Sequence, residues 1–211
     1  MKAGLFCLLT CLSFPALAET LQVEYSRFYS HIRKLNSDDT NALQFAFGFL
    51  RVGERRLCNI TDAKIVTPKQ VMPLVVTAEN RFTVQSEKAL KLADAVVEIS
   101  LKEPANVCDM SVQLETKPEY LKQRYTHADL DMLLDQYTAF FNEMGSFLSF
   151  MMPSVQGLTI QFADSTLDHV LTDELYIQNG MLQLNKEWIE KGQGLTLPHT
   201  PLRITAIASK S

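Results

Sequence analysis

The amino-acid sequence predicts an α+β protein that is rich in strands, with sandwich-like sheets, a few helices packed on them and one disulfide. Short apolar segments of alternating pattern recur roughly every 8–12 residues with turn residues between them, which is typical of a β-sandwich. One longer segment has helical spacing instead. With 46% hydrophobic and 21% charged residues among 211, the composition is that of an ordinary globular protein.

Residues 1–18 have the features of a secretory signal peptide. A lysine provides positive charge, residues 3–12 form an apolar core, and residues 16–18 (Ala-Leu-Ala) fit the cleavage pattern. The core is too short for a permanent membrane-spanning helix, which needs roughly 20 residues. Acylation of Cys11 as a lipoprotein is the alternative, but the residue before it is bulkier than usual. We expect cleavage after Ala18, export to the periplasm and no transmembrane segment in the mature chain.

Cleavage removes two of the four cysteines and leaves Cys58 and Cys108. In an oxidising compartment two such residues are usually paired. Their bridge closes a loop of about 51 residues, for which the chain-entropy model gives about 4 kcal/mol of stabilisation. A redox-active pair is the alternative, but catalytic pairs typically have C-x-x-C spacing, whereas these cysteines lie 50 positions apart. We expect a structural disulfide.

Residues 19–116 are expected to form a β-rich module with a short leading helix. That helix, Ser26–Leu35, places apolar residues at i, i+4 and i+7. The strand Leu43–Leu50 alternates its leucine and phenylalanines with other residues, so that the phenylalanines face a core. A further short helix is expected at Ser86–Leu92. The other extended segments are Arg56–Ile60, Lys64–Val66, Leu74–Thr77, Phe82–Val84, Ala95–Leu101 and Met110–Leu114.

Residues 117–211 are expected to form a helix followed by a second β-rich module, either separate from the first or continuous with it. Helical spacing extends over Glu119–Tyr125 and Ala128–Met152, and acids near the start of the second segment suit a helix N-terminus. Asn179-Gly180 predicts a type I′ hairpin turn. The remaining expected elements are strands at 158–162, 175–177, 181–184, 195–197 and 202–206, and a helix at 186–191 ended by glycine.

Two stretches about 100 residues apart, 75–99 and 175–207, share the order strand, turn, strand, short helix, strand. Few residues are identical between them. Either a duplicated unit or the general frequency of hairpins explains this order.

The long helical segment is unusually rich in methionine and phenylalanine. Its simplest interpretation is a core helix laid across a sheet. The alternative is a surface for an apolar partner or ligand, because these side chains repack easily around apolar groups. The residues of this candidate Met/Phe surface are Phe140, Met144, Phe147 and Met151.

No motif with specific chemistry occurs in the sequence. There is no nucleophile elbow, H-E-x-x-H pair, phosphate-binding loop or dinucleotide fingerprint. The histidines are dispersed, and residues 127–131 (His-Ala-Asp-Leu-Asp) fit a solvated helix start better than a metal site. Arg51, Arg55 and Arg56 are suited to an anion or an acidic partner, although a polar hairpin end is the simpler explanation. We therefore expect no metal and no cofactor, and assign no catalytic residue.

The charge balance argues against nucleic acid as a partner. The chain carries 20 Lys and Arg against 24 Asp and Glu, a formal charge of −4. Loss of Lys2 with the signal leaves 19 against 24, or −5. Phosphate neutralisation needs clustered cations instead.

A set of stretches carries a family resemblance: Tyr25–Tyr29, Leu57–Ala63, Pro73-Leu74, Leu90–Ile99 and Cys108. Together they resemble a small family of exported proteobacterial proteins, the domain of unknown function 2987 family. The resemblance covers nearly the whole mature chain, but its motifs belong to packing rather than catalysis. It implies export and a compact secreted fold, and it brings no activity or functional residues.

Three functions fit these observations. The first is a non-catalytic periplasmic protein that binds an envelope partner through the Met/Phe surface, with Phe140, Phe147 and Met151 partly exposed. The second is a periplasmic hydrolase of cell-wall or glycan material whose carboxylates are gathered by the fold. The third is a carrier of an apolar ligand that the same Met and Phe residues line.

Overall fold

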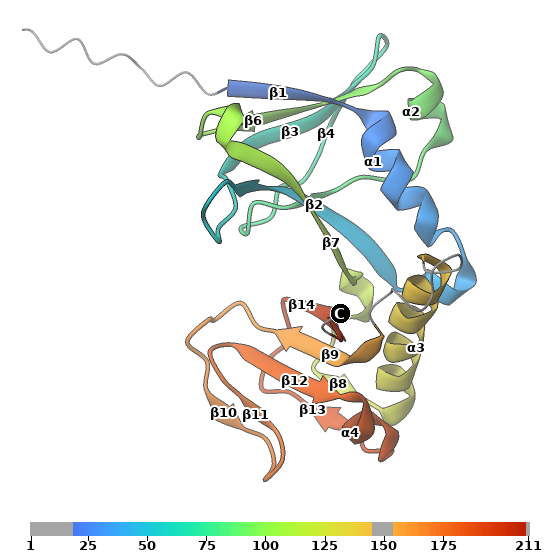
Figure 1. Ribbon diagram of the computed structural model, residues 1–211, viewed down its shortest axis with the longest axis vertical. Coiled ribbons are helices and arrows are strands. Elements are labelled where there is room, and N and C mark those ends of the chain that lie inside the picture. Colours follow the sequence, from blue (N-terminus) through green and yellow to red (C-terminus); the bar gives the residue numbers. More distant parts are fainter. Residues whose placement is uncertain (1–18, 145–153, 210–211) are drawn as a thin grey trace, which may run out of the picture.

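The computed structural model describes residues 19–144 and 154–209. It is β-rich, with several small sheets and few helices (Figure 1), which confirms the predicted fold class. The helices are α1 (Tyr25–Ile32), α2 (Lys88–Leu92), α3 (His127–Met144) and α4 (Lys186–Glu190), and the 3₁₀ turns are η1 (Arg33–Leu35), η2 (Asp38–Thr40), η3 (Ala105–Val107) and η4 (Pro118–Tyr120). The strands are β1 (Glu19–Glu24), β2 (Leu43–Arg51), β3 (Ile60–Val66), β4 (Val71–Pro73), β5 (Phe82–Thr83), β6 (Val96–Leu101), β7 (Cys108–Thr116), β8 (Arg124–Tyr125), β9 (Val155–Gln161), β10 (His169–Val170), β11 (Tyr176–Ile177), β12 (Met181–Asn185), β13 (Leu195–Thr196) and β14 (Arg203–Ala208).

The N-terminal half contains two antiparallel sheets, of strand order β1-β6-β3-β4 and β5-β2-β7. Along β2 the side chains of Leu43, Phe45, Phe47 and Phe49 are all buried, as the predicted period of two requires. The ring of Phe28 on α1 packs edge-on against Phe47, with 4.9 Å between the ring centroids. The alternating phenylalanines are therefore core residues that fix α1 on the sheet.

β1 is a strand that the sequence analysis did not predict. It pairs with β6 over its whole length, from Glu19 opposite Leu101 to Glu24 opposite Val96. Its two partly buried apolar side chains, Leu21 and Val23, alternate with polar ones and pack against the core. Two apolar residues are too short a pattern to identify a strand. The residue after the predicted cleavage point therefore begins a sheet edge.

The C-terminal half is built on a sheet of order β12-β9-β14. One face of this sheet, which includes Leu158, Ile160, Leu184 and Ile204, is buried. Residues of α3 and α4 contact this sheet through β9, and α4 also contacts β12. The helix α4 ends before Gly192, whose φ of 78° is left-handed and whose N–H donates to Ile189.

The predicted hairpin at Asn179-Gly180 is confirmed. Both residues have positive φ, 51° and 69°, as a type I′ turn requires. On either side of them, the backbones of Gln178 and Met181 exchange two hydrogen bonds. The predicted order of elements is only partly found in the stretches 75–99 and 175–207. The strand predicted at Leu74–Thr77 is reduced to an isolated bridge between Val76 and Phe82, and β13 lies between α4 and β14. The pairing also differs, since β5 pairs with β2 whereas β12 pairs with β9.

The predicted helix at Glu119–Tyr125 is wrong. This segment consists of η4 and then β8, which pairs with β13. The hydroxyl of the buried Tyr125 accepts a hydrogen bond from the backbone N–H of Lys122 and donates to the carbonyl of Tyr120. Backbone groups of this segment thus hydrogen-bond to the side chain of Tyr125 instead of to one another, which competes with a regular helix.

The start of α3 agrees with the prediction. Thr126 and Asp129 form a capping box, in which Thr126 N–H donates to Asp129 Oδ2 at 2.7 Å and Asp129 N–H donates to Thr126 Oγ1 at 3.2 Å. Lys122 Nζ lies 2.7 Å from Asp129 Oδ1. The helix extends through Met144, and the remainder predicted up to Met152 lies outside the described residues.

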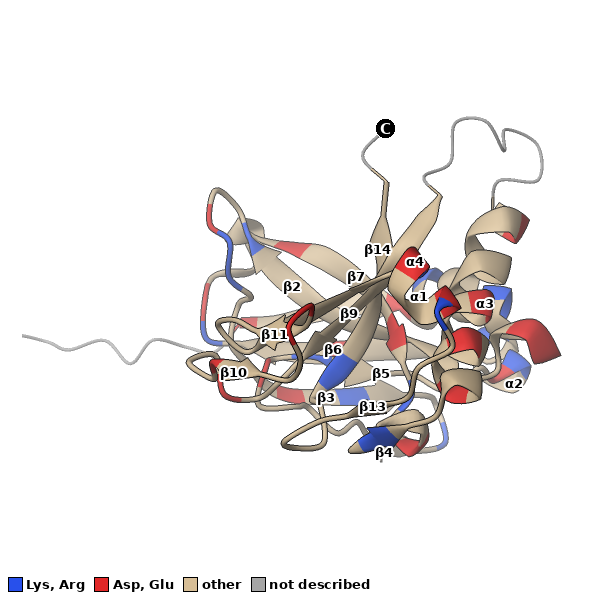
Figure 2. Ribbon diagram, turned by 90° about the horizontal axis from the view of Figure 1, so that it is seen from below, with Lys and Arg blue, Asp and Glu red and all other residues tan. Residues whose placement is uncertain are grey.

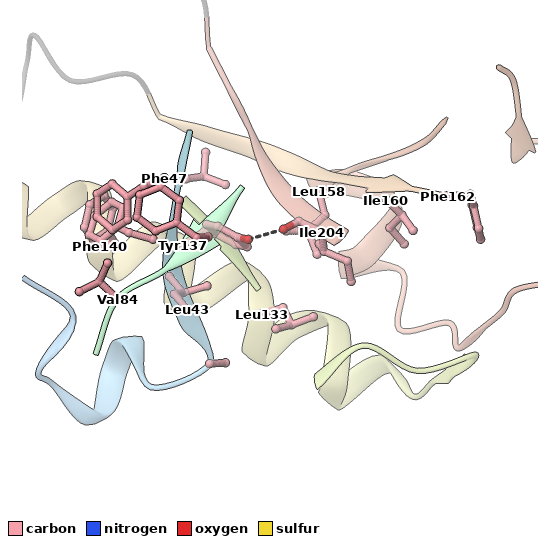
Figure 3. Close-up of a cluster of buried hydrophobic side chains, with 14 of the residues drawn as sticks. Leu43, Phe47, Val84, Leu133, Tyr137, Phe140, Leu158, Ile160, Phe162 and Ile204 are labelled. Atoms are coloured by element: carbon pink, nitrogen blue, oxygen red, sulfur yellow. Dashed lines mark hydrogen bonds between the residues drawn. The ribbon is translucent and has the colours of Figure 1, made fainter. Parts of the chain in front are cut away.

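The helix α3 joins the two halves of the molecule (Figure 3). The backbone N–H of Ala42, before β2, donates to Gln136 Oε1 at 2.6 Å. The next residue of the helix is Tyr137, whose hydroxyl donates a hydrogen bond to the carbonyl of Ile204 on β14. One hydrophobic cluster includes buried residues from both halves. No helix in the described ranges combines the length and apolarity that a membrane crossing demands.

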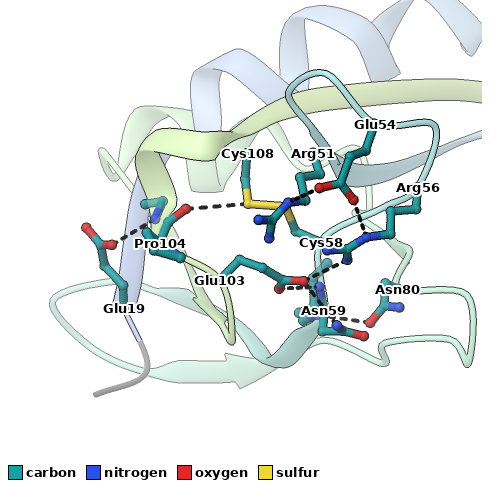
Figure 4. Close-up of a disulfide and its surroundings, with 12 residues drawn as sticks. Glu19, Arg51, Glu54, Arg56, Cys58, Asn59, Asn80, Glu103, Pro104 and Cys108 are labelled. Atoms are coloured by element: carbon teal, nitrogen blue, oxygen red, sulfur yellow. Dashed lines mark hydrogen bonds and ion pairs between the residues drawn. A yellow bond between two sulfur atoms is a disulfide. The ribbon is translucent and has the colours of Figure 1, made fainter. Parts of the chain in front are cut away.

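The disulfide Cys58–Cys108 is formed, with 6.3 Å between the Cα atoms (Figure 4). Cys108 is the first residue of β7 and lies opposite Arg51 of β2. Cys58 lies just before β3 rather than within a strand, and its N–H donates to the carbonyl of Phe49 at 2.7 Å. The bridge therefore fixes the loop after β2 to the beginning of β7.

Two arginines of the cluster, Arg51 and Arg56, are engaged within the fold near the disulfide (Figure 4). Glu54 accepts from Arg51 at 2.6 Å and from Arg56 at 2.5 Å. Arg56 also pairs with Glu103 at 2.9 Å, and the same carboxylate accepts from the backbone N–H of Asn59 at 2.8 Å. These contacts favour the hairpin-end explanation of the arginine cluster over an anion site.

Candidate functional site

Phe140 of the predicted Met/Phe surface is a core residue. Its side chain is 7% exposed, and its ring packs edge-on against Phe45 at 5.7 Å and against Phe141 at 5.6 Å. The prediction that Phe140 forms part of a partner surface is therefore corrected. It faces the phenylalanines of β2, so it is withdrawn from solvent by the packing that fixes α3.

The other members of that surface are placed differently. Met144, at the end of α3, is 41% exposed. Phe147 and Met151 lie outside the described residues. The neighbouring residue Phe141, which was not singled out, lines a groove between the two halves of the molecule.

This groove has a volume of about 370 Å³ and lies between β7 and β14. β7 contributes Val112, Gln113 and Leu114, and β14 contributes Thr205 and Ala206. The helix α3 contributes two aromatic residues, and the segment before β5 contributes an arginine. The lining is therefore mainly apolar, with one cationic group.

Both walls of the groove are edges of sheets. β7 ends the order β5-β2-β7 and β14 ends the order β12-β9-β14, so neither has a second partner among the described strands. Successive side chains of a strand point to opposite faces. Residues 112–114 line one groove together because the groove runs along the edge of β7, and 205–206 do the same on β14. Such edges present unpaired backbone N–H and C=O groups.

Tyr137 ties the two edges together at one end of the groove. Its hydroxyl donates to the carbonyl of Ile204 at 2.6 Å (Figure 3). It accepts from the hydroxyl of Thr116, the last residue of β7, at 3.1 Å. Burial raises the pKa of Tyr137. The phenol therefore stays protonated at neutral pH and remains a permanent donor.

Arg81 is the cation of the groove. It forms no salt bridge with any carboxylate of the described residues. Its Nη1 makes only a long hydrogen bond of 3.5 Å, to the carbonyl of Ala46. Burial lowers the pKa of its guanidinium and the negative charge of Glu115 opposes this shift, but arginine remains charged at neutral pH. Its remaining donors are suited to a carboxylate from outside.

A second arginine, Arg203, serves to hold the groove together. It is buried and pairs with Glu79, in the loop before β5, while its Nη1 donates to Gln113 Oε1 at 2.8 Å. Burial lowers the pKa of its guanidinium. Because both partners come from the N-terminal half and Arg203 lies on β14, the network fixes the two walls relative to each other.

The described lining of the groove contains no carboxylate. Glu115, the next residue along β7, accepts from Gln44 Nε2 at 3.0 Å, and burial raises its pKa. Glu79 is engaged by Arg203. Hydrolysis by paired carboxylates needs acidic side chains that reach the substrate, so the carboxylate hydrolase considered from the sequence is not placed in this groove.

An acidic hollow lies elsewhere, between η2 and α3. It is lined by Asp38, Asp39, Asp131 and Asp135, and Figure 2 shows acidic residues along α3. In residues 19–144 and 154–209, no group of three or more His, Cys, Asp or Glu is arranged to hold a metal ion. We assign no site to this hollow.

Comparison with known proteins identifies one family. Residues 17–162 match the model described as "Protein of unknown function (DUF2987)". The match includes all of the N-terminal half and α3, and it ends just after β9. No curated protein and no solved structure matches the chain.

Proposed function

Because the chain belongs to the DUF2987 family of proteins of unknown function, whose membership brings no activity, we propose a function from the groove itself. The protein is a non-catalytic protein of the periplasm that binds an extended segment of an envelope protein along the groove at the edges of β7 and β14. The observation that carries this proposal is the pair of unpaired sheet edges facing one apolar groove.

Strand addition is the mode of binding that such edges favour. A peptide in extended conformation satisfies the free backbone groups of an edge strand, and its alternate side chains enter the pockets beside it. Val112, Leu114 and Phe141 offer apolar contacts for these side chains. Arg81 lacks a salt bridge within the described residues, so the docked segment is expected to carry an acidic side chain.

The shape of the groove favours a peptide over a small apolar ligand. A small ligand is normally buried over 70–90% of its surface in an enclosed cavity. The space between β7 and β14 is instead open to solvent, and its walls are strand edges with polar backbone groups. We therefore keep the carrier of an apolar ligand as the alternative function, which crosslinking distinguishes from peptide binding.

Two features support export. The first 18 residues have the composition of a signal peptide. The fold contains a disulfide, Cys58–Cys108, of the kind that persists in oxidising compartments.

Site-specific photo-crosslinking in living cells tests the proposal. The crosslinking residue is placed at Val112 on one wall, at Ala206 on the other, and at Val75 as a control that is 85% exposed and does not line the groove. Both groove positions are expected to give an adduct with the same extended segment of one protein, mapped by mass spectrometry. Val75 is expected to give none.

A variant without the charge of Arg81 tests the expected contact with an acidic side chain. Arg81→Gln is expected to reduce the adduct at Val112 strongly, whereas Arg55→Gln, at an exposed position without a salt bridge in the described residues, leaves it unchanged. A lipid adduct at both groove positions would establish the carrier function instead. Equal adducts at Val75 and Val112 would refute the groove as the binding site.

A further inference from the structure

A second hollow, of about 510 Å³, lies on the outer side of the C-terminal sheet. Of its nine lining residues, only Glu174 is charged. Five carry side-chain amides, and we call these the amide face: Gln156, Gln178, Asn179, Gln183 and Asn185. The concentration of uncharged amides is unusual, because solvated sheet surfaces commonly carry charged side chains such as lysine.

The alternation of β12 creates this face. Leu182 and Leu184 are buried in the core, so Met181, Gln183 and Asn185 point to the opposite side and are exposed. The hollow therefore lies on the face of the sheet that is turned away from the core. Next to β12 the hairpin of β10 and β11 carries further lining residues (Figure 1).

The amide groups retain unused hydrogen-bonding capacity. The side chains of Gln178 and Gln183 form no hydrogen bond with any other residue in the described ranges. Asn185 Oδ1 accepts from the N–H of Trp188 at 2.9 Å, which caps α4 and leaves the NH₂ group of Asn185 as a donor. Each free amide offers both donors and an acceptor in one plane.

Besides the amides, the hollow contains one charged side chain and two exposed apolar or aromatic ones. Glu174 lies 2.7 Å from Lys191, so its charge is compensated. Tyr176 is 60% exposed and Met181 is also exposed, although both are side chains that usually seek burial. An exposed aromatic ring beside planar amides has the polar and apolar parts that a pocket for a small polar molecule combines.

We propose that the amide face binds a neutral saccharide. The amides match the neighbouring hydroxyls of a sugar, each of which both donates and accepts, and the ring of Tyr176 contacts the C–H surface of a pyranose. Because the charge of Glu174 is compensated, an uncharged sugar is preferred over an acidic one. This site is independent of the groove, and all of its lining residues except Gln156 lie beyond the family match.

Titration calorimetry on the full exported protein tests this site. The probes are two neutral oligosaccharides, tetra-N-acetylchitotetraose and maltohexaose, and one acidic one, trigalacturonic acid. At least one neutral probe is expected to bind, and more tightly than the acidic one. Absence of heat with both neutral probes at millimolar concentration would overturn the proposal.

Two variants and two matched controls locate the binding. Tyr176→Ala and Gln183→Ala are each expected to weaken binding about tenfold, which corresponds to about 1.4 kcal/mol. Leu92→Ala and Gln193→Ala, exposed positions outside the hollow, are expected to leave the Kd unchanged. Equal affinities in all four variants would show that the saccharide does not bind at the amide face. Arg81→Gln leaves saccharide binding intact, so the two proposals fail separately.

Discussion

The hydroxyl of Tyr137 donates a 2.6 Å hydrogen bond to the backbone carbonyl of Ile204. This bond joins α3 to β14, and the same oxygen accepts from Thr116 at the end of β7. Three elements from both halves of the chain therefore meet at one buried phenol. The contact sets where the groove between the sheet edges closes.

Tyr137→Phe is expected to destabilise the protein by about 1–3 kcal/mol, because it leaves the buried carbonyl of Ile204 and the hydroxyl of Thr116 without their partner. Equilibrium urea unfolding measures this loss. Tyr176→Phe, which removes an exposed hydroxyl, is the control and is expected to change stability by less than about 0.5 kcal/mol. Equal stabilities of the two variants would show that the Tyr137 bonds contribute nothing.

Replacement of both Cys58 and Cys108 by serine is expected to cost about 4 kcal/mol of stability, since the bridge closes a loop of 50-residue separation in the unfolded chain. The measurement is urea unfolding of the double variant beside the oxidised protein. A midpoint that does not move would contradict the role of the disulfide as a constraint on the unfolded state.

The decrease in the free energy of unfolding at low pH is expected to depend on Asp129. Hydrogen bonding to Lys122 lowers the pKa of this carboxyl from 3.8 to about 2. Since the folded pKa is the lower one, the carboxylate stabilises the fold above about pH 4, and this stabilisation is lost as the pH falls from 3.8 to 2. Asp129→Asn should cost about 1 kcal/mol at pH 7, a typical value for a helix cap.

Urea unfolding across pH 2–7 checks this expectation. The difference between wild type and Asp129→Asn should shrink as the pH falls below 4. Asp131→Asn, in the same helical turn but without the capping bonds, is the control. A difference for Asp129→Asn that stays constant with pH would disprove the linkage.

Gly157→Ala is expected to destabilise the fold by more than about 3 kcal/mol. Its φ is 152°, and a Cβ there would lie 2.0 Å from the carbonyl oxygen of Leu184 on the paired strand β12. Gly192→Ala is the matched control, because its φ of 78° is also positive but its Cβ meets no atom within 4 Å. Gly192→Ala should cost only about 1 kcal/mol. Thermal unfolding of both variants separates steric overlap from backbone preference.

The predictable parts of the fold are those with a repeated local signal. The phenylalanines of β2 fix both its face and its extent, and Asn179-Gly180 determines the hairpin turn. β1 has only Leu21 and Val23 to mark it, and its position depends on pairing with the distant β6. At Glu119–Tyr125 the hydrogen bonds of Tyr125 override an apparent helical spacing.

The candidate groove had almost no signal in the sequence. Its walls, residues 112–114 and 205–206, are separated by about 90 residues in the sequence. They are brought together by Tyr137 and by Arg203, which reaches across to Glu79 and Gln113. A free strand edge has no characteristic amino-acid composition, because it depends on whether another strand pairs with it in the folded sheet. Phe141, next to a predicted surface residue, was the nearest indication.

β7 is anchored at both of its ends. Its first residue, Cys108, is bonded covalently to Cys58, and its last residue, Thr116, is held by Tyr137. The edge at 112–114 lies between these fixed points, so a strand docked there as we propose would meet a template that is already ordered and would lose little entropy on binding. Breaking the disulfide frees one end of this template. For the docking that we propose, the redox state of Cys58 and Cys108 would therefore act on recognition as well as on folding, and reduction would speed the release of the docked segment.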